Sequence, residues 1–143
     1  MENQYYGQED TGLQMQNGKF PGIQSPQDLY KALSGIWCAY TCAPRMRQDW
    51  TEENMTLGQC SVTAFLAQDV FGGDVYGIPL KEGGFHCFNL VNGHLFDLTS
   101  AQFREKLDYS NSVIQRREDH FAKTEKKERY EYLKQELIKY CAE

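Results

Sequence analysis

The chain has 143 residues and a formal net charge of −5, with 41% hydrophobic and 13% aromatic residues. This length fits one domain with a single core, and this composition is typical of a globular rather than a disordered protein. The acidic balance, without an early basic patch, argues against nucleic acid as a partner, and no stretch approaches the ~18 apolar residues of a membrane span.

The beginning of the chain and its cysteines indicate a compartment. Residues 1–10 contain three acidic side chains and no apolar block, which is not the pattern of a secretory signal. The five cysteines are irregularly spaced. We therefore expect a cytoplasmic protein with reduced thiols, in which Cys38, Cys42, Cys87 and Cys141 are free.

The first third of the chain divides into an expected arm and an expected helix. Residues 1–24 are rich in Gln, Gly, Asn and Tyr without a period, which predicts a flexible N-terminal arm before a single domain over residues 25–143. Ser25 suits an N-cap and Pro26 suits the first helical position. Apolar residues at helical spacing then predict a helix to about Trp37 or beyond, with Pro44 ending it.

A buried helix and a hairpin follow an irregular segment, 43–57, whose only large anchor is Trp50. The apolar run 62–71 predicts a helix that is mostly buried, starts near Cys60 and ends at Gly72-Gly73. Residues 74–80 predict a strand with breaks. Residues 85–91 and 94–98 predict two strands joined by the tight turn Asn92-Gly93.

The last third is expected to be mainly helical. A short helix is predicted from Thr99 or Ser100 to about Leu107, and a short strand is one interpretation of residues 112–115. A charged helix is predicted over residues 119–140. Its apolar stripe consists of Tyr130, Leu133, Leu137 and Tyr140.

The register of the hairpin places two polar residues together. A two-residue turn pairs Val91 with His94, and hence Phe88 with Asp97. Because directly opposite residues share a face, as do residues two apart on a strand, His86 and Asp97 become diagonal neighbours ~7–8 Å apart at Cα. Cys87 falls on the opposite face, which excludes it from a site containing His86.

The order of Cys60 on a helix, His86 on a strand and Asp97 on the next strand is that of a thiol triad. A helix N-terminus and a neighbouring imidazolium both favour the reactive thiolate. A carboxylate can hold the histidine in one orientation and tautomer.

Each of these residues also has a structural explanation. Cys60 could be a small buried hydrophobe, His86 a structural histidine, and Asp97 a cap for the next helix. Cys87 is expected in the core, and His94 and His120 are expected in solvent.

A zinc site is the metal alternative, with Cys38 and Cys42 spaced by four on a shared helix face and His86-Cys87 adding ligands. Neighbours on a strand point to opposite faces, however, and the chain contains no Cys-x-x-Cys pair. We therefore expect partly buried apolar roles for Cys38 and Cys42.

Two family resemblances rest on these motifs. His86-Cys87-Phe88-Asn89, Gly93 and Phe96-Asp97-Leu98-Thr99 resemble the His-x-Trp-Asn…Gly…Asp-Pro-Thr pattern of transglutaminase-like proteins in the papain-like fold, with Phe88 and Leu98 departing from it. Residues from about 30 to 140 more closely resemble the YunG-like family of small bacterial proteins. The matching residues are Trp50, Asn54, Gly58-Gln59-Cys60, Val62-Thr63-Ala64, Gln68-Asp69, Phe71-Gly72-Gly73, His86, Asn89 and Asp97-Leu98-Thr99.

The resemblances imply an α+β domain of papain-like type, with the Cys60 helix packed on a small antiparallel sheet. The YunG-like resemblance implies a fold and a site rather than a reaction. The triad of Cys60, His86 and Asp97 predicts a cysteine hydrolase or acyltransferase that acts on an amide or ester of a peptide, protein or small molecule, without a cofactor. Asn54, six residues before Cys60, occupies the position of the papain-type oxyanion glutamine. Gln59 is its rival, and Trp50 is a candidate for substrate binding. The alternative is a non-enzymatic interaction module that keeps the fold.

Overall fold

The computed structural model describes residues 4–143, which form helices, strands and three short 3-10 helices. The helices are α1 (Pro26–Ser34), α2 (Cys60–Phe71), α3 (Arg117–Phe121) and α4 (Thr124–Ala142). The strands are β1 (Asp74–Pro79), β2 (Phe85–Val91), β3 (His94–Phe96) and β4 (Val113–Ile114). The 3-10 helices are Pro44–Asp49, Glu52–Asn54 and Ser100–Gln102.

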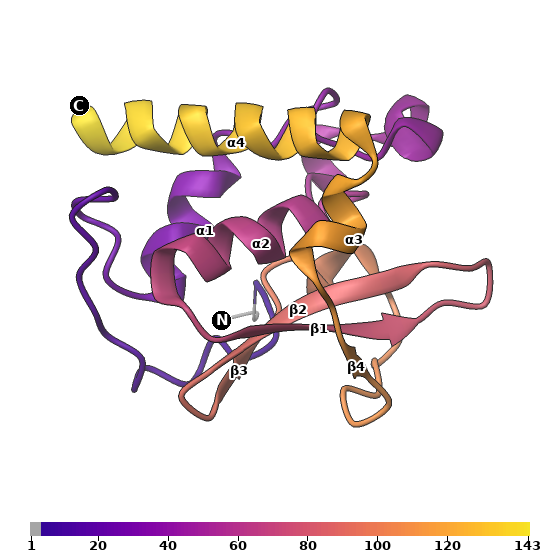
Figure 1. Ribbon diagram of the computed structural model, residues 1–143, viewed down its shortest axis with the longest axis horizontal. Helices are drawn as coiled ribbons and strands as arrows, with labels where there is room; N and C mark the ends of the chain where they lie inside the picture. Colours follow the sequence, from indigo (N-terminus) through magenta and orange to yellow (C-terminus); the bar gives the residue numbers. More distant parts are fainter. Residues whose placement is uncertain (1–3) are drawn as a thin grey trace.

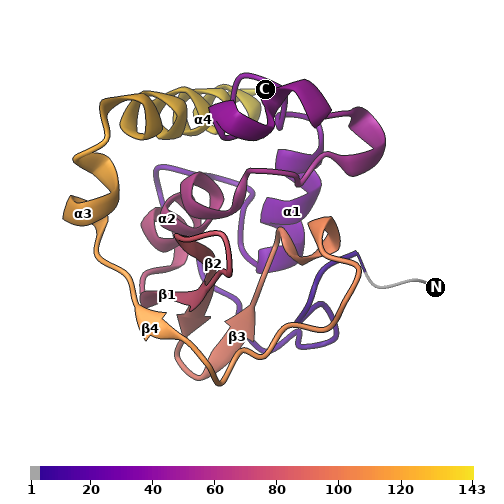
Figure 2. The same ribbon diagram turned by 90° about the vertical axis from the view of Figure 1, so that its right-hand side faces the viewer.

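These elements are stacked in layers. The four strands form one antiparallel sheet in the order β3-β2-β1-β4. Helix α2 lies on one face of this sheet, and α4 lies on the other side of α2 (Figure 1). The view turned by 90° shows the same arrangement (Figure 2). The predicted α+β class, with a central helix on a small antiparallel sheet, is confirmed.

Helix α2 is the centre of the core, as its composition predicts. Nine of its twelve residues are buried, since it is enclosed by the sheet below and α4 above. The helix begins at Cys60 and ends at Gly72, where φ is +79°. Gly73 is also left-handed, at +73°, and this pair of glycines turns the chain directly into β1.

The predicted hairpin register is confirmed between β2 and β3. Val91 pairs with His94, and Asn89 pairs with Phe96. Asn92 (φ +51°) and Gly93 (φ +83°) both take the left-handed conformation that a tight type I′ turn requires. Asp97, just after β3, pairs with Tyr6 of the N-terminal segment instead of extending β3.

The N-terminal segment differs from the expected flexible arm. Tyr5, Leu13, Phe20 and Ile23 are each at most 4% exposed and belong to the main core. The segment passes the end of β3, where Tyr6 pairs with Asp97, and then the C-terminal end of α2, where the Asn17 amide donates to the Asp69 carbonyl at 3.0 Å, before it enters α1 (Figure 1). Four widely spaced apolar residues have no helix or strand period, so periodicity does not detect them. Residues 1–3 of the expected arm lie outside the described residues.

Helix α1 starts where the sequence predicts but ends earlier, next to a glycine. Ser25 caps α1 by accepting a hydrogen bond from the Asp28 N–H, as predicted. The helix ends at Ser34, before Gly35, rather than continuing to Trp37. Cys38 and Cys42 therefore lie on either side of a turn at residues 39–41 instead of sharing a helix face.

The last third of the chain also differs in detail. Only Ser100–Gln102 of the helix expected to reach Leu107 is formed, as one 3-10 turn. The helix expected over residues 119–140 is divided into α3 and α4 near Ala122. In the apolar stripe of α4, Leu133 and Leu137 are fully buried, but Tyr140 is 43% exposed.

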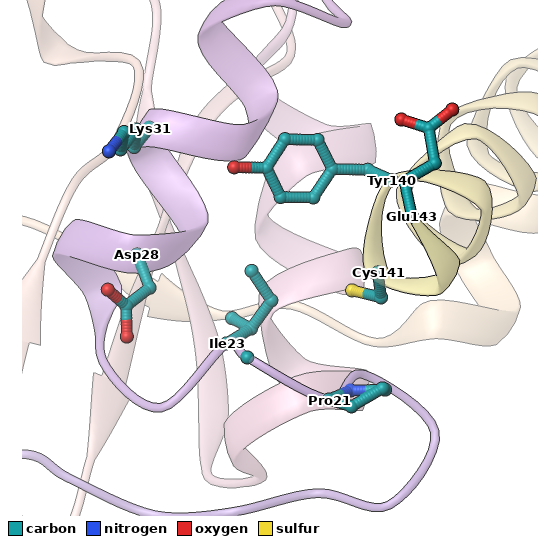
Figure 3. Close-up of a pocket in the computed structure, with 8 residues that line it drawn as sticks. Pro21, Ile23, Asp28, Lys31, Tyr140, Cys141 and Glu143 are labelled. Carbon is teal, nitrogen blue, oxygen red and sulfur yellow. The ribbon is translucent and has the colours of Figure 1, made fainter.

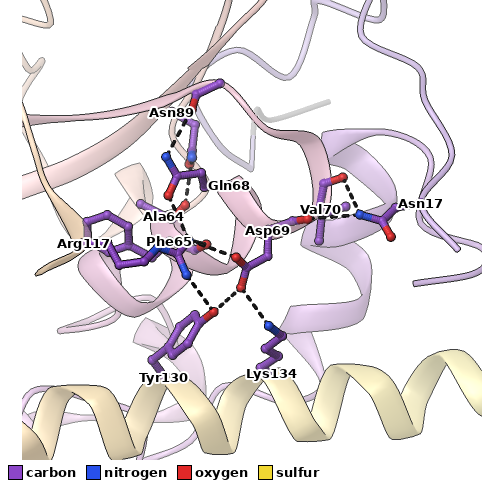
Figure 4. Close-up of polar contacts among 11 residues, drawn as sticks. Asn17, Ala64, Phe65, Gln68, Asp69, Val70, Asn89, Arg117, Tyr130 and Lys134 are labelled. Carbon is purple, nitrogen blue, oxygen red and sulfur yellow. Dashed lines mark hydrogen bonds and ion pairs between the residues drawn. The ribbon is translucent and has the colours of Figure 1, made fainter. Parts of the chain in front are cut away.

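A polar cluster joins these last helices to α2. Asp69 of α2 forms ion pairs with Arg117 (2.9 Å) and Lys134 (3.2 Å). Its carboxylate also accepts a hydrogen bond from the Tyr130 hydroxyl (Figure 4). Arg117 also donates to the Phe65 carbonyl at 3.1 Å. The cluster thus fixes α3 and α4 on the helix that carries Cys60. Within residues 4–143, no helix has the length and apolar character needed to cross a membrane.

Candidate functional site

Three elements bring the predicted triad residues to one place. Cys60 is the first residue of α2, His86 is the second residue of β2, and Asp97 directly follows β3. The His86 Nε2 atom lies 2.6 Å from the Asp97 Oδ2 atom, and both side chains are at most 1% exposed. The predicted diagonal contact across the hairpin is therefore present as a buried hydrogen-bonded pair.

Further contacts hold the Asp97 carboxylate. The Tyr109 hydroxyl donates to Oδ2 at 2.7 Å, and the Thr99 backbone N–H donates to Oδ1 at 3.2 Å. The Tyr6 ring packs on the Tyr109 ring with centroids 4.3 Å apart. Both carboxylate oxygens thus have donors, which keeps the group oriented.

These contacts decide the tautomer of His86. A carboxylate only accepts hydrogen bonds, so the proton bonded to Asp97 belongs to Nε2. The Nδ1 atom is buried and makes no hydrogen bond within the described residues. The Cys60 thiol lies beside this ring and raises its pKa. Nδ1 is therefore the ring atom available to take the thiol proton.

Electrostatics favour an ion pair of thiolate and imidazolium. Cys87 and then His86 outweigh the effect of burial and hold the pKa of the Cys60 thiol well below its usual range. Burial lowers the pKa of His86, but Asp97 and Cys60 together overcome this effect and raise the pKa to about 10. Both shifts point to Cys60 as an activated nucleophile.

Cys87 corrects the face argument from the sequence. Cys87 is expected to be excluded from the site, yet it lowers the pKa of the Cys60 thiol. The reason is the position of the Cys60 Sγ atom, which lies 3.8 Å from the Phe85 carbonyl oxygen, over the backbone of β2. From there the sulfur reaches side chains on both faces of the strand. The proximity of Cys60 and burial together raise the pKa of Cys87 well above its usual range.

Cys60 and His86 line an open groove of about 1400 Å³. The groove runs between the start of α2, the β1–β2 turn, the loop after β3 and the α3–α4 region. Six lysines or arginines and four aspartates or glutamates line it, so its formal charge is +2 in a chain of net charge −5. The basic residues are Arg45, Lys81, Arg116, Lys123, Lys126 and Arg129.

His120 was expected in solvent but lies half-buried in this groove. Its Nε2 atom is 2.8 Å from the Gln115 Oε1 atom, and the Lys126 ammonium approaches its Nδ1 atom at 3.0 Å. Burial and the Lys126 charge lower the pKa of His120 to about 4. His120 is therefore neutral at pH 7 and orients Lys126 near Cys60. The break between α3 and α4, which places His120 here, gives no clear signal in the sequence.

The expected oxyanion and substrate-binding residues are not brought to the groove. The Gln59 amide is buried and donates to the Cys38 carbonyl at 3.1 Å, and the Trp50 indole donates to the Met55 carbonyl at 2.9 Å. Asn54 lies in a 3-10 helix and is not among the residues that line the groove. Instead, Gln102 lines the groove and accepts a hydrogen bond from the Gly58 N–H at 3.2 Å, which fixes the loop before Cys60.

A second cavity, of about 430 Å³, lies between α1, the 21–23 loop and the end of α4 (Figure 3). Cys141 lines it, but no histidine does. All five cysteines are free thiols. Across residues 4–143, no three or more His, Cys, Asp or Glu side chains gather as a metal site.

Comparison with known proteins places the chain in a family. The family model described as "YunG protein" matches residues 25–142. The chain belongs to the YunG family. The "Uncharacterized protein YunG" of Bacillus subtilis (strain 168) is 38% identical over 86 residues, which are 60% of this chain and 72% of that protein. No solved structure matched the chain. The YunG match includes Cys60, His86 and Asp97 but begins after the N-terminal segment.

Proposed function

We propose that the protein is a cysteine-dependent hydrolase or acyltransferase of papain-like type that acts on an amide or ester. The observation that carries this proposal is the buried His86–Asp97 pair beside the Cys60 thiol, at the wall of an open groove. A structural cysteine needs neither a lowered pKa nor access to a groove. Cys60 has both.

The chemistry follows from the arrangement of the three groups. Cys60 attacks the acyl carbon as a thiolate, and the proton held at His86 Nδ1 passes to the leaving amine or alcohol. Asp97 keeps the ring oriented and stabilises the imidazolium. Water or a second nucleophile, deprotonated by His86, then releases the acyl group.

The helix itself replaces the expected oxyanion side chains. No side chain caps the N-terminus of α2, and the first N–H groups of a helix have no partner within it. These groups lie next to Cys60, where the oxyanion of a tetrahedral intermediate would form. The basic lining, Lys126 included, favours a substrate with an anionic portion near the scissile bond.

Trapping of an acyl-enzyme tests the proposal. The protein is incubated with a series of activated esters that carry neutral or anionic acyl groups, and adducts are mapped by peptide mass spectrometry. We expect a hydroxylamine-labile acyl group on Cys60, absent from Cys60→Ser and retained in the control Cys141→Ser. Acylation spread evenly over the exposed cysteines, or none at Cys60, would favour the non-enzymatic interaction module instead.

A further inference from the structure

Cys60 and Cys87 lie opposite each other because α2 and β2 run side by side in matching steps. The Asn89 amide of β2 donates to the Ala64 carbonyl of α2 at 2.8 Å. Moving back four residues on the helix covers ~6 Å, and moving back two residues on the strand covers about 6.6 Å. These steps lead from Ala64 to Cys60 and from Asn89 to Cys87. The contact of the Cys60 sulfur with Phe85 confirms the direction.

The two thiols differ in their access to solvent. Cys60 is partly exposed and lines the groove, whereas Cys87 is 1% exposed beneath it. A small oxidant can therefore reach the Cys60 sulfur through the groove. The Cys87 thiol is buried on the inner side of Cys60, next to the sulfur that has been oxidised. In acyl transfer only Cys60 reacts, and Cys87 contributes only through its effect on the pKa of Cys60.

We propose that Cys60 and Cys87 form a peroxide-reactive thiol pair, in which a hydroperoxide oxidises Cys60 and Cys87 converts the product to a disulfide. The assignment rests on the opposed positions of the two residues and on the open path to one of them. It stands independently of the proposed acyl chemistry.

The reaction balances with groups already present. The Cys60 thiolate attacks one peroxide oxygen, the O–O bond breaks, and the departing hydroxide or alkoxide takes the proton held by His86. The sulfur is oxidised by two electrons to sulfenic acid. The Cys87 sulfur then attacks the Cys60 sulfur, and its proton leaves with the hydroxyl group as water. A dithiol reductant that attacks the exposed Cys60 sulfur restores both thiols.

The disulfide would change the site as well as record the oxidation. Closing an S–S bond of about 2.05 Å draws the Cys60 sulfur toward Cys87 and away from the His86 ring. Cys60 is then neither a nucleophile nor open to irreversible oxidation to sulfinic acid. The pair would thus protect the groove nucleophile reversibly.

Peptide mapping without reductant tests the pair directly. The full chain is treated with a small excess of hydrogen peroxide, and free thiols are then blocked with N-ethylmaleimide in denaturant. Trypsin cleaves after Arg47, Lys81 and Arg104, so Cys60 and Cys87 fall in separate peptides, 48–81 and 82–104, that contain no other cysteine. We expect these peptides as one cross-linked species that dithiothreitol separates.

Variants make the result specific. Cys87→Ala is expected to lose the cross-link and to accumulate Cys60 sulfenic acid, which dimedone traps, while Cys141→Ser keeps the cross-link. Two results with peroxide-treated wild type would overturn the proposal: sulfinic acid at Cys60 with maleimide at Cys87, or maleimide at both cysteines. Neither result depends on whether Cys87→Ala folds. Acyl adducts on Cys60 without the Cys60–Cys87 cross-link would support the proposed function and contradict the thiol pair. The cross-link without acyl adducts would support the thiol pair and contradict the proposed function.

Discussion

The Asp97 carboxylate contacts both His86 and Tyr109, and only the first of these two contacts can be predicted from the sequence. The hairpin turn determines that His86 lies beside Asp97, so the sequence predicts this contact. Tyr109 reaches Asp97 from an irregular loop, 12 positions later, with no period to reveal it. Gln59 and Asn54 have suitable amides, but sequence spacing cannot show that the Gln59 amide turns inward to Cys38.

Tyr109→Phe tests the hydrogen bond that the Tyr109 hydroxyl donates to the Asp97 carboxylate. Removing the hydroxyl leaves a buried Asp97 oxygen with one donor fewer, so we expect the free energy of unfolding to fall by about 1–2 kcal/mol. Urea denaturation measures the change. Tyr132→Phe, in a ring that is 41% exposed, is the control and should melt like wild type. Equal stability of the two variants would contradict the proposed role of Tyr109.

At the scale of elements, short sequence motifs correctly predict the ends of helices and strands where the motif requires a particular backbone conformation, such as a helix cap or a positive φ. The N-cap of α1, the glycines after α2 and the Asn92-Gly93 turn are examples, since each fixes its own neighbourhood. The early end of α1 coincides with Gly35, whereas α3 and α4 on either side of their break both pair with Asp69 of the distant helix α2. Single-sequence patterns do not contain that pairing.

Gly58→Ala tests the loop that positions Cys60. Gly58 has φ +69°, and an added Cβ would lie 2.6 Å from the Cys42 sulfur and 2.8 Å from the Ala43 backbone nitrogen. Strain and overpacking together should lower the free energy of unfolding by about 2–3 kcal/mol. Thermal melting measures it, with Gly18→Ala as a control in open space and without positive φ. A variant as stable as the control would show that the loop adapts freely.

Asp69→Asn tests the cluster that attaches α3 and α4 to α2. The substitution keeps the shape but removes the charge that faces Arg117 and Lys134. We expect a loss of about 2 kcal/mol in unfolding free energy, because Asp69 is only partly exposed and its cationic partners remain. The exposed Asp74→Asn is the control. Equal denaturation midpoints would mean that apolar packing alone holds these helices.

At the scale of the molecule, the N-terminal segment completes both the core and the site. It contributes four buried side chains, and Tyr6 lies against Asp97 and Tyr109. Composition rich in Gln, Gly and Asn suggests mobility, but burial depends on a few apolar residues rather than on the average. The groove likewise arises only when segments far apart in sequence meet, so its basic lining has no linear signature.

Phe20→Ala tests whether the segment is part of the fold. Phe20 is 1% exposed, and its truncation should lower the free energy of unfolding by about 3 kcal/mol through lost burial and a cavity. Chemical denaturation measures the loss, and the exposed Gln16→Ala is the control. If both variants unfold at the same denaturant concentration, the segment is loosely attached.

The pH dependence of Cys60 alkylation tests the central claim, that Asp97 acts through His86 to activate Cys60. Because the pKa of Cys60 is lowered and that of His86 is raised to about 10, the ion pair persists from mildly acidic pH to about pH 10. Reactivity is lost only when the pH falls through the lowered thiol pKa. Iodoacetamide labelling is followed by mass spectrometry between about pH 5 and pH 9.

The account predicts fast labelling of wild-type Cys60 at about pH 6 and, in Asp97→Asn, a labelling profile displaced to higher pH. At pH values below the thiol pKa, the labelling rate should fall about tenfold for each unit by which that pKa rises. Asp10→Asn, in the exposed Asp10–His94 pair, is the matched control and should label like wild type. Melting curves accompany each variant to separate reactivity from folding. A folded Asp97→Asn variant whose Cys60 labels as fast as wild type at every pH would contradict the claim.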